Sequence, residues 1–394
     1  MIKRIGAVLA GLIFLGFTAQ AQAPQPAAGT TAPHRVVSPE KQPDGKITFR
    51  IAAPKASDVQ LQLAAGGVRL HPMSKGSDGV WSVTIGPLEP ETYNYSYSVD
   101  GLRVYTVNPD ASVVDVPGTE PRFDQLQNVP HGSINIHSYF STVQNRLRGM
   151  YIYVPPQYYS EPTRKFPVLY LWHGGGGNEP DWTRSGRTAN ILDNLISEKK
   201  AVPMIIVMPN NNVLIPVEGG NIGASAVLEK ELFDEIMPYV EKSYRVLTGR
   251  DNRAIAGLSA GGGTTLNVGM RRLDMFAYLG EFSAGIFGGA APNPGAAEGE
   301  GGGDARAVAA AGYGPYDPDK MAPGMYKNLV DPAKKLKVFW MSVGTEDPRL
   351  PFQKLALEDF QKHGIQPIFN TYSGAHEWKV WRHSLNDFAP LLFR

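Results

Sequence analysis

Residues 253–263 constrain the fold more than any other part of the chain. Apolar residues at 254–256 predict a buried strand, and a helical pattern begins only a few residues later. Between the two, residues 257–261 read Gly-Leu-Ser-Ala-Gly, which is a G-x-S-x-G sequence. A chain that turns this sharply from strand to helix needs small residues beside the serine, because larger side chains would collide. The stretch therefore predicts a nucleophile elbow that holds Ser259 at a helix N-terminus, where negative charge is favoured.

Composition sets the broad class of the protein. The chain has 394 residues, which is enough for two domains and a sizeable core. Its formal net charge is +1 and charged residues make up 19%, so we expect no nucleic-acid partner. Cysteine is absent from the sequence. Disulfides, thiolate chemistry and cysteine-rich zinc sites are thereby excluded.

The N-terminus has the pattern of an export signal. Two basic residues precede an apolar run at 5–17, and small residues at 19–23 offer cleavage sites of the A-x-A type. These features predict a signal peptide over 1–23, export to the periplasm or the medium, and no stable membrane insertion after cleavage. A membrane anchor is the alternative, but the apolar run is short for a bilayer. Residues 24–34 are rich in Pro, Ala, Gly and Thr and predict a flexible leader.

Residues 35–116 show the two-residue periodicity of short antiparallel strands. Asp-Gly pairs, which favour tight turns, punctuate this part of the chain. Alternating apolar and polar residues occur in four segments, at 47–51, 59–63, 80–85 and 93–99. We therefore predict a small all-β sandwich over 35–116, followed by a linker over 117–130.

The segment 79–101 within this region resembles the immunoglobulin-like modules of carbohydrate-binding module family 48. The resemblance implies an immunoglobulin-like domain in front of a glycan-active enzyme. In one interpretation, Trp81 and the tyrosines at 93–97 stack on sugar rings. In the other, which we favour, one face of these alternating strands fills the core of the sandwich.

Residues 131–394 alternate between buried strands and helices. Apolar runs at 166–172, 204–208, 338–343 and others read as strands, and segments of helical spacing lie between them. This order predicts an α/β domain with a mostly parallel sheet covered by helices on both faces. Residues 284–324, rich in Gly and Ala, interrupt the alternation. They are interpreted as a lid over the sheet edge, with a solvated loop as the alternative.

A serine hydroxyl becomes a nucleophile only beside a base that a third group orients. Hydrolases of this architecture carry the three groups in the order serine, acid, histidine. His376 follows a predicted strand at 367–372, and Glu346 and Asp347 follow the strand at 338–343. We predict Ser259, Asp347 and His376 as the catalytic residues. Asp347 is preferred to Glu346 because its shorter side chain has fewer rotors to fix, although the spacing leaves both open.

A tetrahedral intermediate needs backbone donors directed at its oxyanion. The amide of Ala260, which follows the candidate nucleophile, is one expected donor. The second is expected from the glycine loop at 173–177, which leaves an apolar strand as an HGGG-type motif does. Within that loop we select Gly175 as the donor.

From about residue 131 to the C-terminus, the sequence resembles the esterase-D-like α/β-hydrolases, and within them the feruloyl esterases of carbohydrate esterase family one. The resemblance implies an α/β-hydrolase fold, the triad and oxyanion residues named above, and no metal or organic cofactor. It places Trp182 on the acyl side of the cleft, with a packing role as the alternative, and adds Glu179 and Asn210 as substrate-binding candidates. Its matches lie at 169–174, 179–182, 186–190, 208–210, 244–246, 253–262, 344–347 and 374–378.

The expected function is therefore an exported serine esterase that releases ferulic or a related hydroxycinnamic acid from plant cell-wall polysaccharide. A feruloylated or acetylated glycan is the expected partner, and the sequence leaves the oligomeric state open. Alternatives of the same chemistry are an acetylxylan esterase, a siderophore esterase and an acyltransferase of the mycolyl-transferring kind. A glycan-binding protein with an inert hydrolase scaffold is the alternative of another class.

Overall fold

The computed structural model describes residues 36–65, 67–104, 112–284, 317–327, 329 and 336–394. The signal peptide and leader predicted for 1–34 lie outside these residues, and so does most of the segment 284–324. Near the described end of that segment, Ala322 is buried in the core, and so is Met325 just after it.

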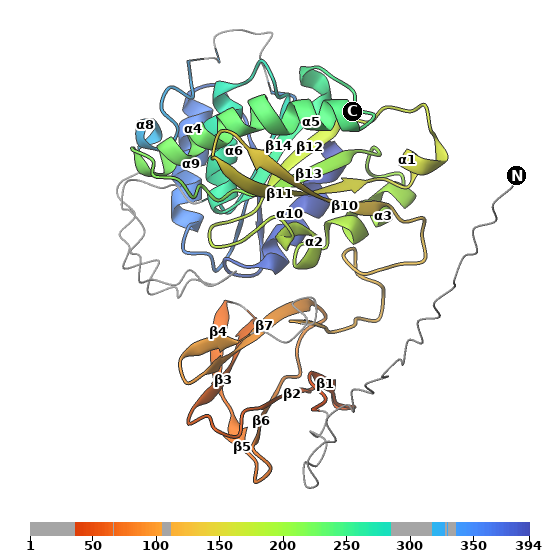
Figure 1. The fold of residues 1–394 in the computed structure, drawn as a ribbon, viewed down its shortest axis with the longest axis vertical. Coiled ribbons are helices and arrows are strands. Elements are labelled where there is room, and N and C mark those ends of the chain that lie inside the picture. The colour runs from red at the N-terminus through yellow and green to blue at the C-terminus, as the bar shows by residue number, and fades with distance from the viewer. Residues whose placement is uncertain (1–35, 66, 105–111, 285–316, 328, 330–335) are drawn as a thin grey trace, which may run out of the picture. The chain divides into compact units, whose positions relative to one another are not determined.

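The N-terminal region is built from two antiparallel sheets, drawn in red and orange in Figure 1. One sheet has the order β1-β2-β6-β5, and the other has the order β4-β3-β7-β8 with β9 paired to β7. The strands are β1 (Glu40–Lys41), β2 (Ile47–Ala52), β3 (Val59–Ala64), β4 (Val68–Pro72), β5 (Ser74–Lys75), β6 (Val80–Ile85), β7 (Thr92–Val99), β8 (Leu102–Val104) and β9 (Val113–Asp115).

Aromatic side chains fill the space between these two sheets. Trp81, Tyr95 and Tyr97 are all buried, and Phe49 packs edge-on against Tyr95 with ring centroids 4.9 Å apart. The indole N–H of Trp81 donates to the carbonyl of Ala53. These contacts agree with the core-packing interpretation, because buried rings offer no face on which a sugar could stack.

A mixed sheet of eight strands forms the centre of the C-terminal region (Figure 1). Its order is β10-β11-β13-β12-β14-β15-β16-β17, with antiparallel pairing at β10–β11–β13 and parallel pairing elsewhere. The strands are β10 (Ser133–Ser141), β11 (Arg146–Val154), β12 (Val168–Trp172), β13 (Ile205–Pro209), β14 (Arg253–Leu258), β15 (Tyr278–Phe282), β16 (Val338–Gly344) and β17 (Ile368–Tyr372).

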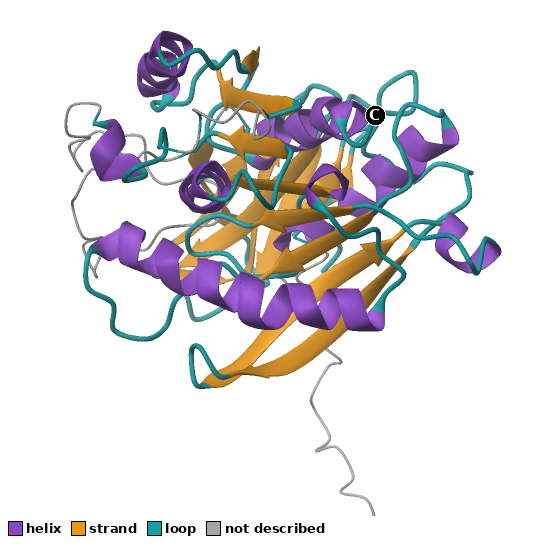
Figure 2. Cartoon of the chain, turned by 90° about the horizontal axis from the view of Figure 1, so that it is seen from above, coloured by secondary structure: helices purple, strands orange, loops and turns teal. Residues whose placement is uncertain are grey.

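Helices cover both faces of this sheet, as Figure 2 shows from above. The α-helices are α1 (Gln157–Ser160), α2 (Asp181–Arg184), α3 (Thr188–Ser197), α4 (Gly220–Glu231), α5 (Met237–Ser243), α6 (Ala260–Arg271), α8 (Pro318–Met321), α9 (Leu350–Lys362) and α10 (Trp378–Phe388). A π-helical turn, Leu232–Ile236, joins α4 to α5, and 3-10 turns occur at Arg250–Asn252 and Ala389–Leu391.

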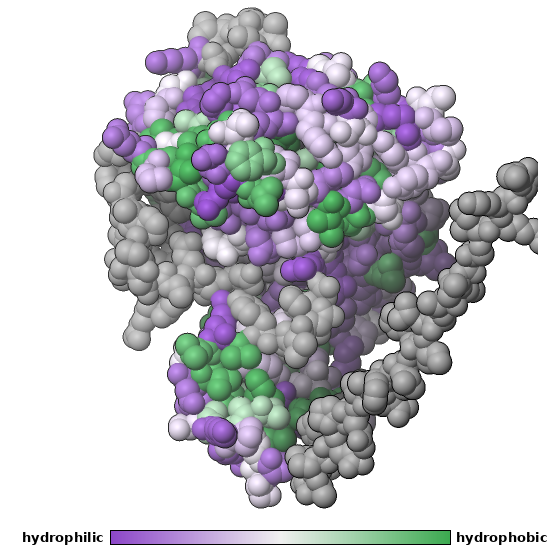
Figure 3. All heavy atoms as spheres, viewed as in Figure 1, coloured by the Kyte–Doolittle hydropathy of each residue, from purple (hydrophilic) through white to green (hydrophobic). Residues whose placement is uncertain are grey.

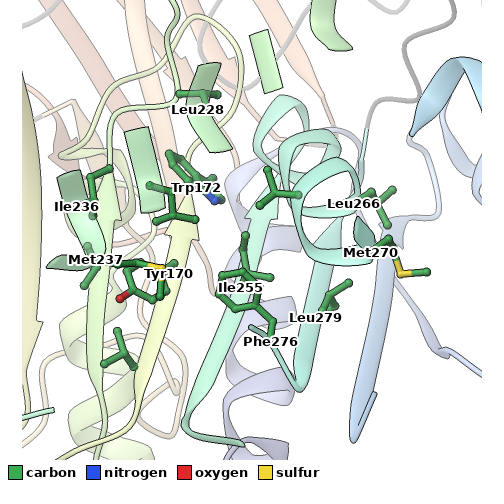
Figure 4. Close-up of a cluster of buried hydrophobic side chains, with 14 of the residues drawn as sticks. Tyr170, Trp172, Leu228, Ile236, Met237, Ile255, Leu266, Met270, Phe276 and Leu279 are labelled. Atoms are coloured by element: carbon green, nitrogen blue, oxygen red, sulfur yellow. The ribbon is translucent and has the colours of Figure 1, made fainter. Parts of the chain in front are cut away.

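Alternate residues of the central strands enter two separate cores, because successive strand side chains point to opposite faces. Tyr170 and Trp172 of β12 pack with the cluster that includes α6, whereas Leu169 and Leu171 pack with the cluster that includes α3 and α10. Figure 4 shows the first cluster, in which strand side chains such as Ile255 lie beside Leu266 of α6. The continuous apolar runs in the sequence follow from this double burial.

The face drawn in Figure 3 is mostly hydrophilic, with hydrophobic residues gathered in separate groups. Some apolar side chains of β10 and β11 are exposed, namely Ile136, Phe140 and Leu147. No helix among the residues described has both the length and the apolar character that a membrane span requires.

A buried arginine joins the last helix to the N-terminal region. Arg382 of α10 is fully buried, and its Nη2 donates to Glu91 Oε1 at 2.9 Å and to the carbonyl of Thr92 at 2.7 Å. Its Nε lies 2.9 Å from Oδ2 of Asp124, a residue that is also fully buried. Burial alone would raise the pKa of Glu91, but Arg382, the backbone N–H of Thr92 and the charge of Arg122 together keep the pKa of that carboxyl below its usual value. Arg382 thus neutralises Glu91 and, together with Arg122, Asp124, two carboxylates that are removed from water.

Replacing Arg382 by methionine is expected to lower the free energy of unfolding by about 3–5 kcal/mol. Glu91 would remain buried without the cation that donates to it, and Asp124 would keep only Arg122 as a partner. Lys230→Met is the matched control, because Lys230 pairs with Asp234 on an exposed surface, where solvent screening leaves an ion pair with little effect on stability. Urea denaturation followed by circular dichroism measures both. Equal, small losses in the two variants would contradict the role given to Arg382.

Candidate active site

Ser259 occupies a strained turn between β14 and α6. Its φ of 50° and ψ of −115° lie in a region that a non-glycine residue rarely adopts. A Cβ atom added at Gly257 would lie 2.4 Å from the carbonyl oxygen of Gly261. One added at Gly261 would lie 2.5 Å from the carbonyl oxygen of His173. Glycine is therefore required on both sides of the serine, which is the physical reason for the G-x-S-x-G sequence.

The structure brings Ser259, Asp347 and His376 together at the carboxyl ends of three parallel strands. Ser259 follows β14, Asp347 follows β16, and His376 lies between β17 and α10. His376 Nε2 is 2.9 Å from the Ser259 hydroxyl oxygen, and its Nδ1 is 2.7 Å from Asp347 Oδ2. This order of contacts, nucleophile to base to carboxylate, is the one that serine catalysis uses.

Glu346 takes no part in this chain of contacts. Its carboxylate accepts hydrogen bonds from the backbone N–H of Gly374 and the hydroxyl of Thr345. Glu346 thereby braces the loop that precedes His376, while the shorter Asp347 reaches the imidazole. Of the two neighbouring carboxylates that the sequence left open, only Asp347 contacts His376.

The surroundings keep the imidazole neutral and the carboxylate charged. Burial lowers the pKa of His376, and the Arg349 guanidinium lowers it further, while Asp347 acts in the opposite direction. Burial raises the pKa of the Asp347 carboxyl, but His376 and Arg349 together hold it below its usual value. At neutral pH the charged Asp347 accepts from Nδ1–H of His376. Nε2 of the imidazole is then left free to accept the serine proton.

The glycine loop after β12 lies against the nucleophile. A Cβ atom at Gly174 would come within 2.6 Å of the Leu258 side chain and 3.3 Å of Ser259 Cβ. The next residue, Gly175, is exposed. Ala260 is the first residue of α6, where backbone N–H groups have no acceptor within the helix. The two amides proposed as oxyanion donors thus belong to segments that flank Ser259.

His173 anchors this loop, a role that the sequence reasoning missed. Its ring is buried, Nδ1–H donates to the carbonyl of Gly174 at 2.7 Å, and Nε2 accepts the backbone N–H of Asn211 at 2.8 Å. Burial lowers the pKa of His173 to about 4, so the ring is neutral and one nitrogen is free to accept. The signal in the sequence was the histidine that opens the HGGG-type motif.

Comparison with known proteins places this site in a family. The family model named Esterase matches residues 141–392. The chain belongs to the Esterase family. It is thereby a carboxylic-ester hydrolase by class, and the matched range includes all three residues of the Ser259–His376–Asp347 contact chain.

Curated relatives of the esterase are longer proteins. A Xylanibacter ruminicola protein named endo-1,4-beta-xylanase/feruloyl esterase is 32% identical over 369 residues, which are 89% of this chain and 45% of the relative. Endo-1,4-beta-xylanase Y of Acetivibrio thermocellus is 32% identical over 146 residues, which are 34% of this chain and 13% of the relative. The chain therefore spans less than half the length of these relatives.

Solved structures show the α/β-hydrolase fold. A ferulic acid esterase from Anaeromyces mucronatus is 26% identical with a TM-score of 0.53, and the match covers 68% of this chain and 93% of that one. The enterobactin esterase of Shigella flexneri is 14% identical with a TM-score of 0.56, and the match covers 88% of this chain and 92% of that one. At 14% identity the second likeness concerns the fold alone.

The structure places Trp182 in the core and not on the wall of a cleft. Its side chain is fully buried, and its indole N–H donates to the carbonyl of Trp172 at 2.9 Å. The ring packs edge-on against Phe282 and Trp378. A side chain with no exposed surface cannot contact an acyl group, so the packing alternative replaces the substrate-binding role expected for Trp182.

Glu179 and Asn210 contact each other beside the glycine loop. The amide nitrogen of Asn210 donates to Glu179 Oε2 at 2.6 Å, and the backbone carbonyl of Asn210 accepts from Arg148 Nη2 at 2.7 Å. Arg148 in turn forms a buried ion pair with Glu231. The polar groups of both candidates are thus engaged in bracing the loop after β13.

A cavity of about 240 Å³ lies beside the segment that follows the glycine loop. Its polar walls include Asn178, Asp181 and Arg184 near α2, and Asn94 and Ser96 of β7. Trp378 contributes an aromatic surface, and the triad residues are not among those that line the cavity. Within the described residues, no group of three or more His, Asp or Glu side chains is arranged to hold a metal ion.

A carboxyl group that the sequence reasoning did not single out lies behind the triad acid. Glu281 of β15 is fully buried, and its Oε2 accepts from the backbone N–H of Ala284 at 2.9 Å and from Gln353 Nε2 at 3.3 Å. Burial raises the pKa of Glu281 to about 8, which outweighs these hydrogen bonds, and the nearby Asp347 adds to the rise. Glu281 is therefore protonated at neutral pH.

A carboxyl whose pKa is raised on folding stabilises the protein at low pH, and this stability is lost as the pH rises through the folded value. Between about pH 5 and 8 the esterase is thus expected to lose on the order of 1 kcal/mol per pH unit relative to the variant Glu281→Gln. Urea denaturation at intervals across this range provides the test. Parallel stability curves for the two proteins would show that Glu281 is ionised in the folded state.

Proposed function

We propose that the protein is an exported serine esterase that releases ferulic acid or a related hydroxycinnamic acid from plant cell-wall polysaccharide. The observation that carries the chemistry is the contact chain from the Ser259 hydroxyl through the His376 imidazole to the Asp347 carboxylate. Export rests on the basic and apolar pattern of residues 1–23 in the sequence.

In the acylation step, His376 Nε2 accepts the proton of Ser259 as its oxygen attacks the ester carbonyl. Asp347 stabilises the imidazolium that forms, and the backbone amides of Ala260 and Gly175 donate to the oxyanion. The imidazolium then gives its proton to the departing sugar hydroxyl. Water attacks the acyl-enzyme by the same route, which frees the acid and restores the serine.

The hydroxycinnamoyl specificity is supported by the relatives. The curated relative that aligns with 89% of this chain has feruloyl esterase in its name. Another structure of the Anaeromyces mucronatus enzyme, 26% identical to this chain, contains ferulic acid. The amide, hydroxyl and guanidinium groups that line the cavity near α2 are of the kind that hydrogen-bond to sugar hydroxyls.

Ser259→Ala is expected to abolish turnover of aryl and feruloyl esters, a loss of about 10⁴-fold or more, since the nucleophile is removed and no other group replaces it. Release of p-nitrophenol from p-nitrophenyl acetate measures the change, and a circular dichroism melt checks that the variant is folded. Glu358→Gln is the matched control, because this carboxylate of α9 is exposed and takes no part in the site. Persistent activity in Ser259→Ala would refute the assignment.

A substrate panel tests the acyl specificity. Methyl ferulate, feruloylated arabinoxylan, acetylated xylan and a catechol-siderophore lactone are compared at equal concentration, with released acid measured by chromatography. The proposal expects the highest kcat/KM on the feruloyl esters. Preference for acetylated xylan or for the lactone would replace the feruloyl specificity while leaving the serine mechanism in place. Glycan binding without labelling by a serine-directed phosphonate would support an inert hydrolase scaffold.

A further inference from the structure

Arg349 lies against the side of the triad acid that faces away from the imidazole. It precedes α9 and is 9% exposed, and its Nη1 is 3.5 Å from Asp347 Oδ1. The backbone N–H of Arg349 donates to the same oxygen at 3.0 Å. The other carboxylate oxygen, Oδ2, is the one that contacts His376. One carboxylate is therefore shared between a permanent cation and the catalytic base.

We propose that Arg349 is a positioning residue that sets the lower pH limit of the reaction, by drawing part of the Asp347 charge away from His376. The inference rests on the proposed serine mechanism, in which the imidazole must be neutral to accept the serine proton. It assigns to Arg349 a function beyond holding the loop, because the guanidinium disfavours the protonated form of the base.

Charge accounts for the direction of the effect. A cation close to the imidazole makes the imidazolium less favourable, and Asp347, which would stabilise it, is already partly neutralised. Arg349 is accordingly the second cause, after burial, that lowers the pKa of His376. Without the guanidinium the pKa of His376 would rise. The enzyme would then lose activity at a higher pH as the base becomes protonated.

The other groups near His376 do not compete with Arg349 for this role. Trp381 of α10 and Ser259 of the elbow contact the ring but carry no charge. Glu377 accepts from the backbone N–H of Ala375, and Glu346 from that of Gly374. Glu281, behind Asp347, is protonated below about pH 8, because burial raises its pKa to about 8. Among the residues that the structure describes, Asp347 and Arg349 are the charges that shift the pKa of His376.

The test compares three variants with the wild type by kcat/KM for p-nitrophenyl acetate between pH 4 and 9. Arg349→Gln removes the charge, and the midpoint of its acid limb is expected to move up by about one pH unit. Arg349→Lys keeps the charge, and its midpoint is expected to stay within about 0.3 pH unit of the wild type. Lys354→Gln removes an exposed charge from the same helix, α9, and is expected to leave the midpoint unchanged.

A second readout needs no substrate assignment. The rate of labelling by a serine-directed phosphonate also depends on a neutral base, so its pH dependence is expected to shift in the same way. An unmoved acid limb in Arg349→Gln would overturn the inference, and so would an equal shift in Arg349→Lys. A wild-type protein that neither hydrolyses esters nor reacts with the phosphonate would instead overturn the proposed function. If Arg349→Gln fails to fold, Arg349→Met provides the same comparison.

Discussion

The imidazole of His376, held between a hydroxyl and a carboxylate, is the interaction on which the rest of this structure depends. Its two nitrogens have different partners, at 2.9 Å and 2.7 Å, and a neutral ring with its proton on Nδ1 donates to the carboxylate and accepts from the hydroxyl. A buried carboxylate alone would favour the charged ring. Burial of the ring and the cation at residue 349 counter that tendency, so that the base is unprotonated where it is needed.

This geometry depends on a sheet whose strands end at one edge. The nucleophile, the acid and the base follow β14, β16 and β17, and the glycine loop with His173 follows β12. Because these strands are parallel, residues far apart in the sequence meet without any long connection having to cross the sheet. Two apolar cores, one on each face, fix the strands in register. Packing thus determines the position of the reacting groups to within hydrogen-bond distance.

Much of this arrangement was predictable from the sequence, because the continuous apolar runs and the glycines beside Ser259 each have a single good structural explanation. The choice between Glu346 and Asp347 depends on which carboxylate a turn directs inward, and that requires the loop geometry. The position of Trp182 could not be predicted, because the sequence does not show whether an aromatic residue near a cleft motif lines the cleft or fills the core. The burial of Glu281 could not be predicted for a similar reason, because a single polar residue in an apolar strand gives no periodic signal that would indicate its role.

The ion pairs of Arg382 have a consequence for how this enzyme can be recombined with others. The arginine belongs to α10, yet its hydrogen-bond partners Glu91 and Thr92 belong to the N-terminal β-region. Excising that region would remove the acceptors of Arg382 Nη2 and leave the guanidinium with Asp124 and the carbonyl of Ser185, and a buried charge that loses a partner is costly. An exchanged N-terminal module therefore has to offer new acceptors to Arg382, or the residue at position 382 has to change with it. The two regions are therefore joined by buried hydrogen bonds as well as by the chain between them.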